Sequence, residues 1–163
     1  QLTGCQLSQL MHEFEKIITF QGPSQVIKKQ TVEQLVPKNL EYNIFELNHL
    51  VFSGQTNQAL DFFQELLLQK EDPIKIIALL ISEFRLLLQV KILQEQNLGQ
   101  RQISEQLKVH WYRVKLAMEK TRAFSVHQLA AWLEELIDLD YQIKTGKVNP
   151  VLGFEWFVLK FNR

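Results

Sequence analysis

The segment PIKIIALLISEFRLLLQV, residues 73–90, constrains the fold of this chain more than any other stretch. Its apolar residues fall on most faces of a helix, so other helices must surround it. Lys75, Glu83 and Arg85 interrupt it, and three charges at membrane depth would be costly, which excludes a membrane span. We therefore expect a buried helix at the centre of a soluble domain.

The sequence also indicates where this central helix begins and ends. Asp72-Pro73 is a strong start signal, because Asp caps the free amides and Pro fits the first helical position. We expect the helix to run to about Leu98 and to stop at Gly99 in a left-handed conformation.

Apolar residues recur with 3.6-residue spacing along the rest of the chain, and the strict alternation of a half-buried strand is absent. Capping boxes at Thr31 and Ser125 and an Asn149-Pro150 pair mark further helix starts. The expected helices cover residues 6–20, a short stretch from Thr31, residues from an Asn43 cap to about Ser53, a stretch from Thr56 or Asn57, residues 125–146 and a last helix after Asn149. The last helix is expected to carry Leu152, Trp156, Leu159 and Phe157, and residues 151–161 have apolar side chains on more than one face of the helix.

Short links between these helices predict an all-α bundle with mostly antiparallel neighbours. Pro37 ends the second helix, and Lys38-Asn39 is expected to be a hinge. We place a domain boundary between residues 37 and 38, because the first 37 residues are too few to close a core. The expected architecture is a bundle of about six to seven helices over residues 38–163, preceded by a short helical segment over residues 1–37.

The composition is that of an ordinary globular domain, with 163 residues, 46% apolar and 22% charged. Eighteen basic and eighteen acidic residues give a formal net charge of zero, which argues against a surface that is basic throughout. The single cysteine, Cys5, and the lack of a signal-peptide pattern fit a reducing, cytoplasmic compartment.

No catalytic, cofactor-binding or metal site is predicted. None of His12, His49, His110 and His127 has a second His or Cys at helical ligand spacing. The carboxylates Glu134, Glu135, Asp138 and Asp140 alternate with apolar residues, so we interpret them as a solvated acidic face. Phosphate-binding and nucleophile-elbow motifs are also absent from the sequence.

Residues 97–120, NLGQRQISEQLKVHWYRVKLAMEK, have the spacing of a helix-turn-helix. Ile103, Leu107, Val109, Val114 and Met118 supply the packing face. The basic residues Arg113, Lys115, Lys120 and Arg122 are then expected to point to solvent. Trp111 and Tyr112 are bulky and poor at reading base edges. A protein-binding helical module is favoured over a helix-turn-helix DNA-binding module, which stays open as the alternative.

Several blocks of the chain resemble one family in order and spacing. They are YNIFELNHLVFSGQTNQALDFFQELL, ALLISEFRLLLQVKIL, ISEQLKVHWYRVKLAMEKTRAFS and LDLDYQIKTGKVNP, preceded by LSQLMHEFEKIITFQG. Together they resemble the delta subunit of bacterial DNA polymerase III, part of its clamp loader. One departure is Trp111, where the family usually has Pro after the His.

The resemblance implies a C-terminal collar domain over residues 38–163 and a remnant of an AAA+-like lid domain over residues 1–37. It implies a non-catalytic chain without ATPase activity in a DNA replication machine. The implied partners are the gamma/tau and delta-prime subunits through the collar. The sliding clamp would be bound only by the family's N-terminal region, which this chain lacks.

Primer–template DNA is a further partner to consider. Lys144 and Lys147 flank Gly146 and form a basic tip after the long helix. Arg113 and Lys115 lie in the helix-turn-helix region. Contacts at these four residues would be to phosphate, independent of base sequence and weakened by salt.

Overall fold

A computed structural model describes residues 7–22, 27–28, 31–32 and 40–161 of the chain. Within these ranges the secondary structure is helical and no residue lies in a β-strand, which confirms the predicted all-α class. The chain divides into two compact units, Gln1–Glu46 and Leu47–Arg163. The predicted capping partner Gln34, Pro37 and the hinge at Lys38-Asn39 lie outside the described residues.

The first unit contains α1 (Leu7–Gln21), close to the predicted residues 6–20. Ile17 of α1 is buried, whereas Leu10, Met11, Phe14 and Ile18 are exposed. Thr31 and Val32 are helical, as expected. α3 (Leu40–Phe52) begins three residues before Asn43. The prediction of Asn43 as a cap was therefore wrong: this side chain lies inside the helix and is buried.

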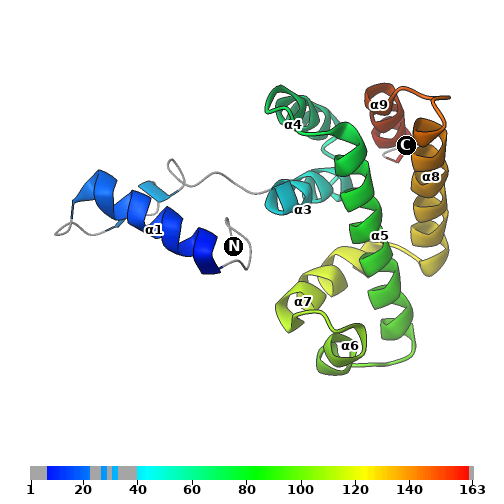
Figure 1. The fold of residues 1–163 in the computed structure, drawn as a ribbon. Coiled ribbons are helices and arrows are strands. Elements are labelled where there is room, and N and C mark those ends of the chain that lie inside the picture. The colour runs from blue at the N-terminus through cyan, green and yellow to red at the C-terminus, as the bar shows by residue number, and fades with distance from the viewer. Residues whose placement is uncertain (1–6, 23–26, 29–30, 33–39, 162–163) are drawn as a thin grey trace. The chain divides into compact units, whose positions relative to one another are not determined.

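The second unit is built around α5, as the sequence predicted. It contains α4 (Thr56–Leu68), α5 (Pro73–Glu95), α6 (Gln100–Leu107), α7 (Trp111–Lys120), a short 3₁₀ helix η1 (Thr121–Ala123), α8 (Val126–Lys144) and α9 (Pro150–Phe161). α5 runs beside α8 and also contacts α6, α7 and α9 (Figure 1). Residues 40–161 thus hold seven α-helices, within the range expected for the bundle.

Three predicted helix starts are confirmed by their hydrogen bonds. Asp72 Oδ1 accepts from the Ile74 amide at 2.9 Å, and Asn149 Oδ1 accepts from the Val151 amide at 2.9 Å. Ser125 and Gln128 form the predicted capping box, in which the side chain of each accepts from the backbone amide of the other. Each bond satisfies an amide that lacks a partner within the helix.

The end of α5 differs from the prediction. The helix stops at Glu95, and Asn97, with φ of 63°, adopts the left-handed conformation assigned to Gly99. Asn is one of the few residues that tolerate this region. Gly99 has an extended backbone and begins α6 instead, with its amide donating to Gln102 Oε1 at 2.9 Å.

Aromatic side chains from α3, α4, α5 and α9 pack against one another. The Phe52 ring centroid lies 4.9 Å from that of Phe84 and 5.3 Å from that of Phe161, and Phe63 of α4 stacks on Phe154 of α9 at 4.0 Å. Rings at these separations contribute beyond the area that they bury. The core is therefore fixed by contacts between residues that are distant in sequence.

The apolar residues that were expected on α9 lie on two faces of the helix. Its buried residues are Gly153, Phe154, Phe157 and Val158. Leu152, Trp156 and Leu159 lie on the opposite face and are 64%, 59% and 51% exposed. Ile137 of α8 is exposed as well. None of the helices that the structure describes is long and apolar enough to cross a membrane.

Candidate nucleic-acid and protein interfaces

The α6–α7 corner, residues 100–120, packs on the second half of α5. Ile103 and Val114 are fully buried against Leu87 and Val90. Leu107, Val109 and Met118 cover this cluster from the edge. The predicted packing face of the helix-turn-helix is therefore confirmed, and the apolar contact fixes how the outer face of the corner is presented to solvent.

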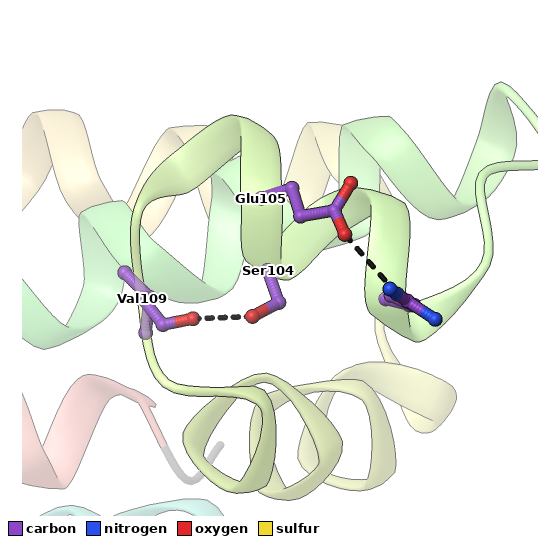
Figure 2. A network of polar contacts seen from close by, with 4 residues as sticks. Ser104, Glu105 and Val109 are labelled. Carbon is purple, nitrogen blue, oxygen red and sulfur yellow. Dashed lines mark hydrogen bonds and ion pairs between the residues drawn. The ribbon is translucent and has the colours of Figure 1, made fainter.

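The turn between the two helices is held by specific bonds. Lys108 adopts a left-handed backbone with φ of 54°, and the Val109 amide donates to the Ser104 carbonyl at 3.2 Å. Ser104 Oγ donates in return to the Val109 carbonyl at 2.7 Å. Figure 2 shows this bond and, beside it, an ion pair that Glu105 forms. The His110 ring Nδ1 accepts from the Tyr112 amide at 3.3 Å and caps α7.

The basic residues of α7 do not share one environment. Lys115 is exposed as predicted, and so is Arg122 just after the helix. Arg113 is exposed but also forms an ion pair with Glu83 of α5. The prediction for Lys120 was wrong, because this side chain is partly buried. Burial, with the nearby Arg113 guanidinium as a smaller cause, lowers the pKa of Lys120 from 10.5 to about 8.

The tip after α8 carries the second predicted pair of lysines. Lys144 and Lys147 are both exposed on either side of Gly146, whose φ of 73° ends the helix as expected. Lys144 Nζ donates to Asp140 Oδ2 at 2.6 Å, and Lys147 Nζ lies 5.7 Å from the centroid of the exposed Tyr141 ring. An anion at this tip would meet the exposed Lys147 and would compete with Asp140 for Lys144.

The carboxylates of α8 do not converge on one point. Glu134 and Asp138 are exposed, whereas Glu135 accepts from Lys160 of α9 at 2.7 Å and Asp140 accepts from Lys144. Glu134 and Asp138 are thus solvated as expected, whereas the side chains of Glu135 and Asp140 are mostly covered. Among the described residues, no group of three or more His, Cys, Asp or Glu side chains is placed to hold a metal ion.

The apolar stripe of α9, defined as Leu152, Trp156 and Leu159, lies on the face of the helix that is turned away from the core. These residues are spaced four and three apart and therefore share one face of the helix. Polar contacts border the stripe: Gln64 Nε2 donates to Glu155 at 2.9 Å, and Lys160 pairs with Glu135. Lys160 Nζ also lies 4.9 Å from the Trp156 ring centroid. An exposed tryptophan between apolar neighbours and a polar rim is typical of a protein-binding surface.

Comparison with known proteins decides the family. The sequence profile of the DNA polymerase III delta subunit, C-terminal domain, matches residues 41–161. The chain belongs to this family. It is 43% identical over 159 residues to DNA polymerase III subunit delta of Bacillus subtilis strain 168, a match over 98% of this chain and 46% of that protein.

The fold agrees with this membership. The solved structure of the DNA clamp loader delta protein of Bacillus subtilis superposes with a TM-score of 0.86 and 44% identity, over 96% of this chain and 46% of the other. The chain thus spans about half the length of the relatives that it matches. These matches do not favour the alternative of a separate helix-turn-helix regulator.

Proposed function

We propose that this chain is the part of a clamp loader delta subunit that holds the subunit in the loader during DNA replication. The C-terminal helical domain would act as a collar domain and bind the corresponding domains of the gamma/tau and delta-prime subunits. The observation that carries the proposal is the delta-subunit match over residues 41–161, in a chain whose solved relative is called a clamp loader protein. Its domain limits would be residues 1–37 for the lid remnant and 38–163 for the collar.

The apolar stripe of α9 supports a role in assembly. A domain of this size has enough helices to cover α5, and it does so with α6, α7, α8 and α9. The three large side chains of the stripe are left over from that packing. Tryptophan at the centre of an apolar patch is a common binding hot spot. We therefore propose the stripe as one contact surface for a neighbouring subunit.

The chain itself would be non-catalytic. Clamp opening would belong to the N-terminal part of the delta subunit, which the match to this chain does not cover. Among the described residues, no group of three or more His, Cys, Asp or Glu side chains could hold a metal ion.

Contact with the phosphates of primer–template DNA is a second element of the proposal. Lys144 and Lys147 are exposed on one tip, and Lys115 is exposed on α7. Arg113 would have to share its guanidinium between Glu83 and a phosphate. Such contacts follow the backbone and are independent of base sequence.

The assembly proposal is tested with purified partners. The folded chain is mixed with the gamma/tau and delta-prime subunits of the same bacterium and passed over a size-exclusion column. We expect a complex that contains the chain. A helical chain, verified by circular dichroism, that elutes apart from both partners would overturn the proposal.

The DNA contact is tested in the assembled loader. Replacing Lys144 and Lys147 by Gln removes two phosphate contacts and should lower the slope of log affinity against log salt by about two. An unchanged slope and affinity would remove these residues from the DNA interface and leave the assembly proposal intact.

A further inference from the structure

We propose that the outer face of the α6–α7 corner binds an unpaired strand of nucleic acid, with Trp111 as the stacking platform for a base and Lys115 as a phosphate contact. The proposal shares Lys115 with the phosphate contacts proposed above and is independent of assembly through the collar.

Packing in the core does not account for the position of Trp111. It is the first residue of α7, its side chain is 54% exposed, and it takes no part in the apolar cluster of the corner. Two aromatic rings flank it, since the Trp111 ring centroid lies 5.7 Å from that of His110 and 5.8 Å from that of Tyr112. Tyr112 is exposed as well. An unpaired base stacks on an accessible ring of this kind.

An open hollow lies next to the Trp111 ring. It is lined by Gln100, Arg101, Ser104, Glu105 and Trp111. Gln100 Nε2 donates to the Trp111 carbonyl at 3.0 Å, which ties the start of α7 to α6. Arg101 Nε donates to Glu105 Oε1 at 3.1 Å, an exposed ion pair that places a positive charge beside the carboxylate that lines the hollow. The Ser104 hydroxyl already forms a hydrogen bond in the turn between α6 and α7, as Figure 2 shows. A flat base therefore finds room beside the ring without meeting an uncompensated negative charge.

The charge around the hollow complements a polyanion. Residues 100–122 hold six basic residues and two acidic ones, a difference of four positive charges in a chain whose net charge is zero. Lys108, Lys115 and Arg122 have no carboxylate partner within the part of the chain that the structure describes. Lys115 lies one turn after Trp111 on the same face of α7. A strand stacked on the ring would place its backbone near this ammonium group.

Exposed aromatic rings favour a single strand over a duplex. A duplex hides the faces of its bases, and its edges are read by slender polar side chains at the start of a recognition helix. Trp111 and Tyr112 occupy that position here. Aromatic rings with flanking cations are the usual means of binding unpaired strands without sequence preference.

The experiment measures fluorescence anisotropy of a labelled oligothymidylate and a labelled oligouridylate of about 16 nucleotides, a length that covers one binding site. The 163-residue chain is titrated at low salt and at a series of higher salt concentrations. Replacing Trp111 by Leu keeps an apolar side chain but removes the ring, and should weaken binding about ten-fold. Trp111→Phe keeps a ring and should retain most of the affinity.

Lys115→Gln should lower the slope of log affinity against log salt concentration by about one. The matched control is Lys75→Gln, on the exposed side of α5, which should leave this slope unchanged. Circular dichroism verifies that each variant is folded. Binding of Trp111→Leu as tight as that of the unaltered chain, or equally effective competition by a duplex, would overturn the stacking role. A changed slope with Lys115→Gln beside an unaffected Trp111→Leu would leave phosphate contact standing and remove the single-strand site.

Discussion

Asn48 of α3 is an unusual residue in the core of the second unit. It is 1% exposed, and neither its Nδ2 nor its Oδ1 has a hydrogen-bond partner in the described part of the chain. An unsatisfied buried amide costs about 1–3 kcal/mol, and an apolar group of similar shape removes that cost. We therefore expect Asn48→Leu to raise the free energy of unfolding by about 1 kcal/mol.

Chemical denaturation of the two proteins measures this difference. Asn48→Asp is the matched control, since it keeps the shape of the side chain and adds a charge, and it should lower stability. A loss of stability with Leu would mean that the amide has a partner in solution.

Lys120 makes stability depend on pH. Its pKa is about 8 in the folded chain against 10.5 for an ordinary lysine, because burial and then Arg113 disfavour the charge. As the pH rises, the folded state therefore loses the Lys120 proton before the unfolded state does. Between about pH 8 and pH 10.5 the unfolded state binds more protons than the folded state. Stability should rise with pH across that window, by on the order of 1–2 kcal/mol after allowance for solvent screening.

Lys120→Met should remove this rise and should be more stable than the unaltered chain at pH 7. Urea denaturation of both proteins at about pH 7 and about pH 10, on either side of most of the shift, tests the difference. Other groups titrate equally in both proteins, so parallel pH profiles would show that the Lys120 ammonium group is well solvated in the folded state.

At the scale of whole helices, the cap of α8 should contribute measurably to stability. Ser125 Oγ accepts from the Gln128 amide at 3.2 Å, and Gln128 Oε1 accepts from the Ser125 amide at 2.9 Å. Ser125→Ala removes the first of these bonds and should lower the free energy of unfolding by about 1 kcal/mol.

Ser53→Ala is the matched control for the cap. Ser53 is exposed after α3, and its hydroxyl donates to the His49 carbonyl at 2.7 Å without capping a free amide. Its loss should change stability by no more than about 0.5 kcal/mol. Equal effects of the two substitutions in thermal denaturation would contradict a capping role of Ser125.

The starts of α5, α8 and α9 were predictable from the sequence, whereas the start of α3 and the faces that helices bury were less so. A start at Asp72-Pro73 or Ser125 depends on bonds between residues two or three apart, so the local sequence contains the whole signal. The face of α9 depends on distant partners. The helix carries two apolar stripes, and the stacking of Phe154 on Phe63 selects one of them. Gly153 gave a usable hint, because a Cβ there would lie 2.6 Å from Leu139 Cδ1, and a glycine inside a helix often marks close packing.

The interactions of individual charges were the least predictable part of the candidate site. Arg113 and Lys115 are two residues apart and have similar chemistry, yet only Arg113 reaches Glu83, thirty residues earlier in the chain. The burial of Lys120 likewise comes from the packing of α7 on α5, as in the apolar cluster of the corner. Which basic residues remain available for phosphate thus becomes clear only from the tertiary structure.

For the whole molecule, the apolar stripe of α9 links the fold to assembly. Phe154 and Phe157 of α9 are buried in the core of the domain. The three large apolar residues on the other face of α9 are exposed. Exposing so much apolar surface has a cost in water that a partner would relieve. If the stripe binds a neighbouring subunit, Trp156→Ser should weaken association at least ten-fold, because hot-spot residues contribute about 2 kcal/mol or more.

Leu68→Ser on α4 is the matched control for this substitution. Leu68 is 84% exposed, more than Trp156, and it lies outside the stripe. Both variants should unfold near the temperature of the unaltered chain, since surface substitutions have small effects on stability. Titration of each variant with gamma/tau and delta-prime subunits then separates the roles. Equal affinities for Trp156→Ser and Leu68→Ser would assign assembly to another face of the domain, whereas selective loss with Trp156→Ser would identify α9 as a helix that packs on its own subunit with one face and on a neighbour with the other.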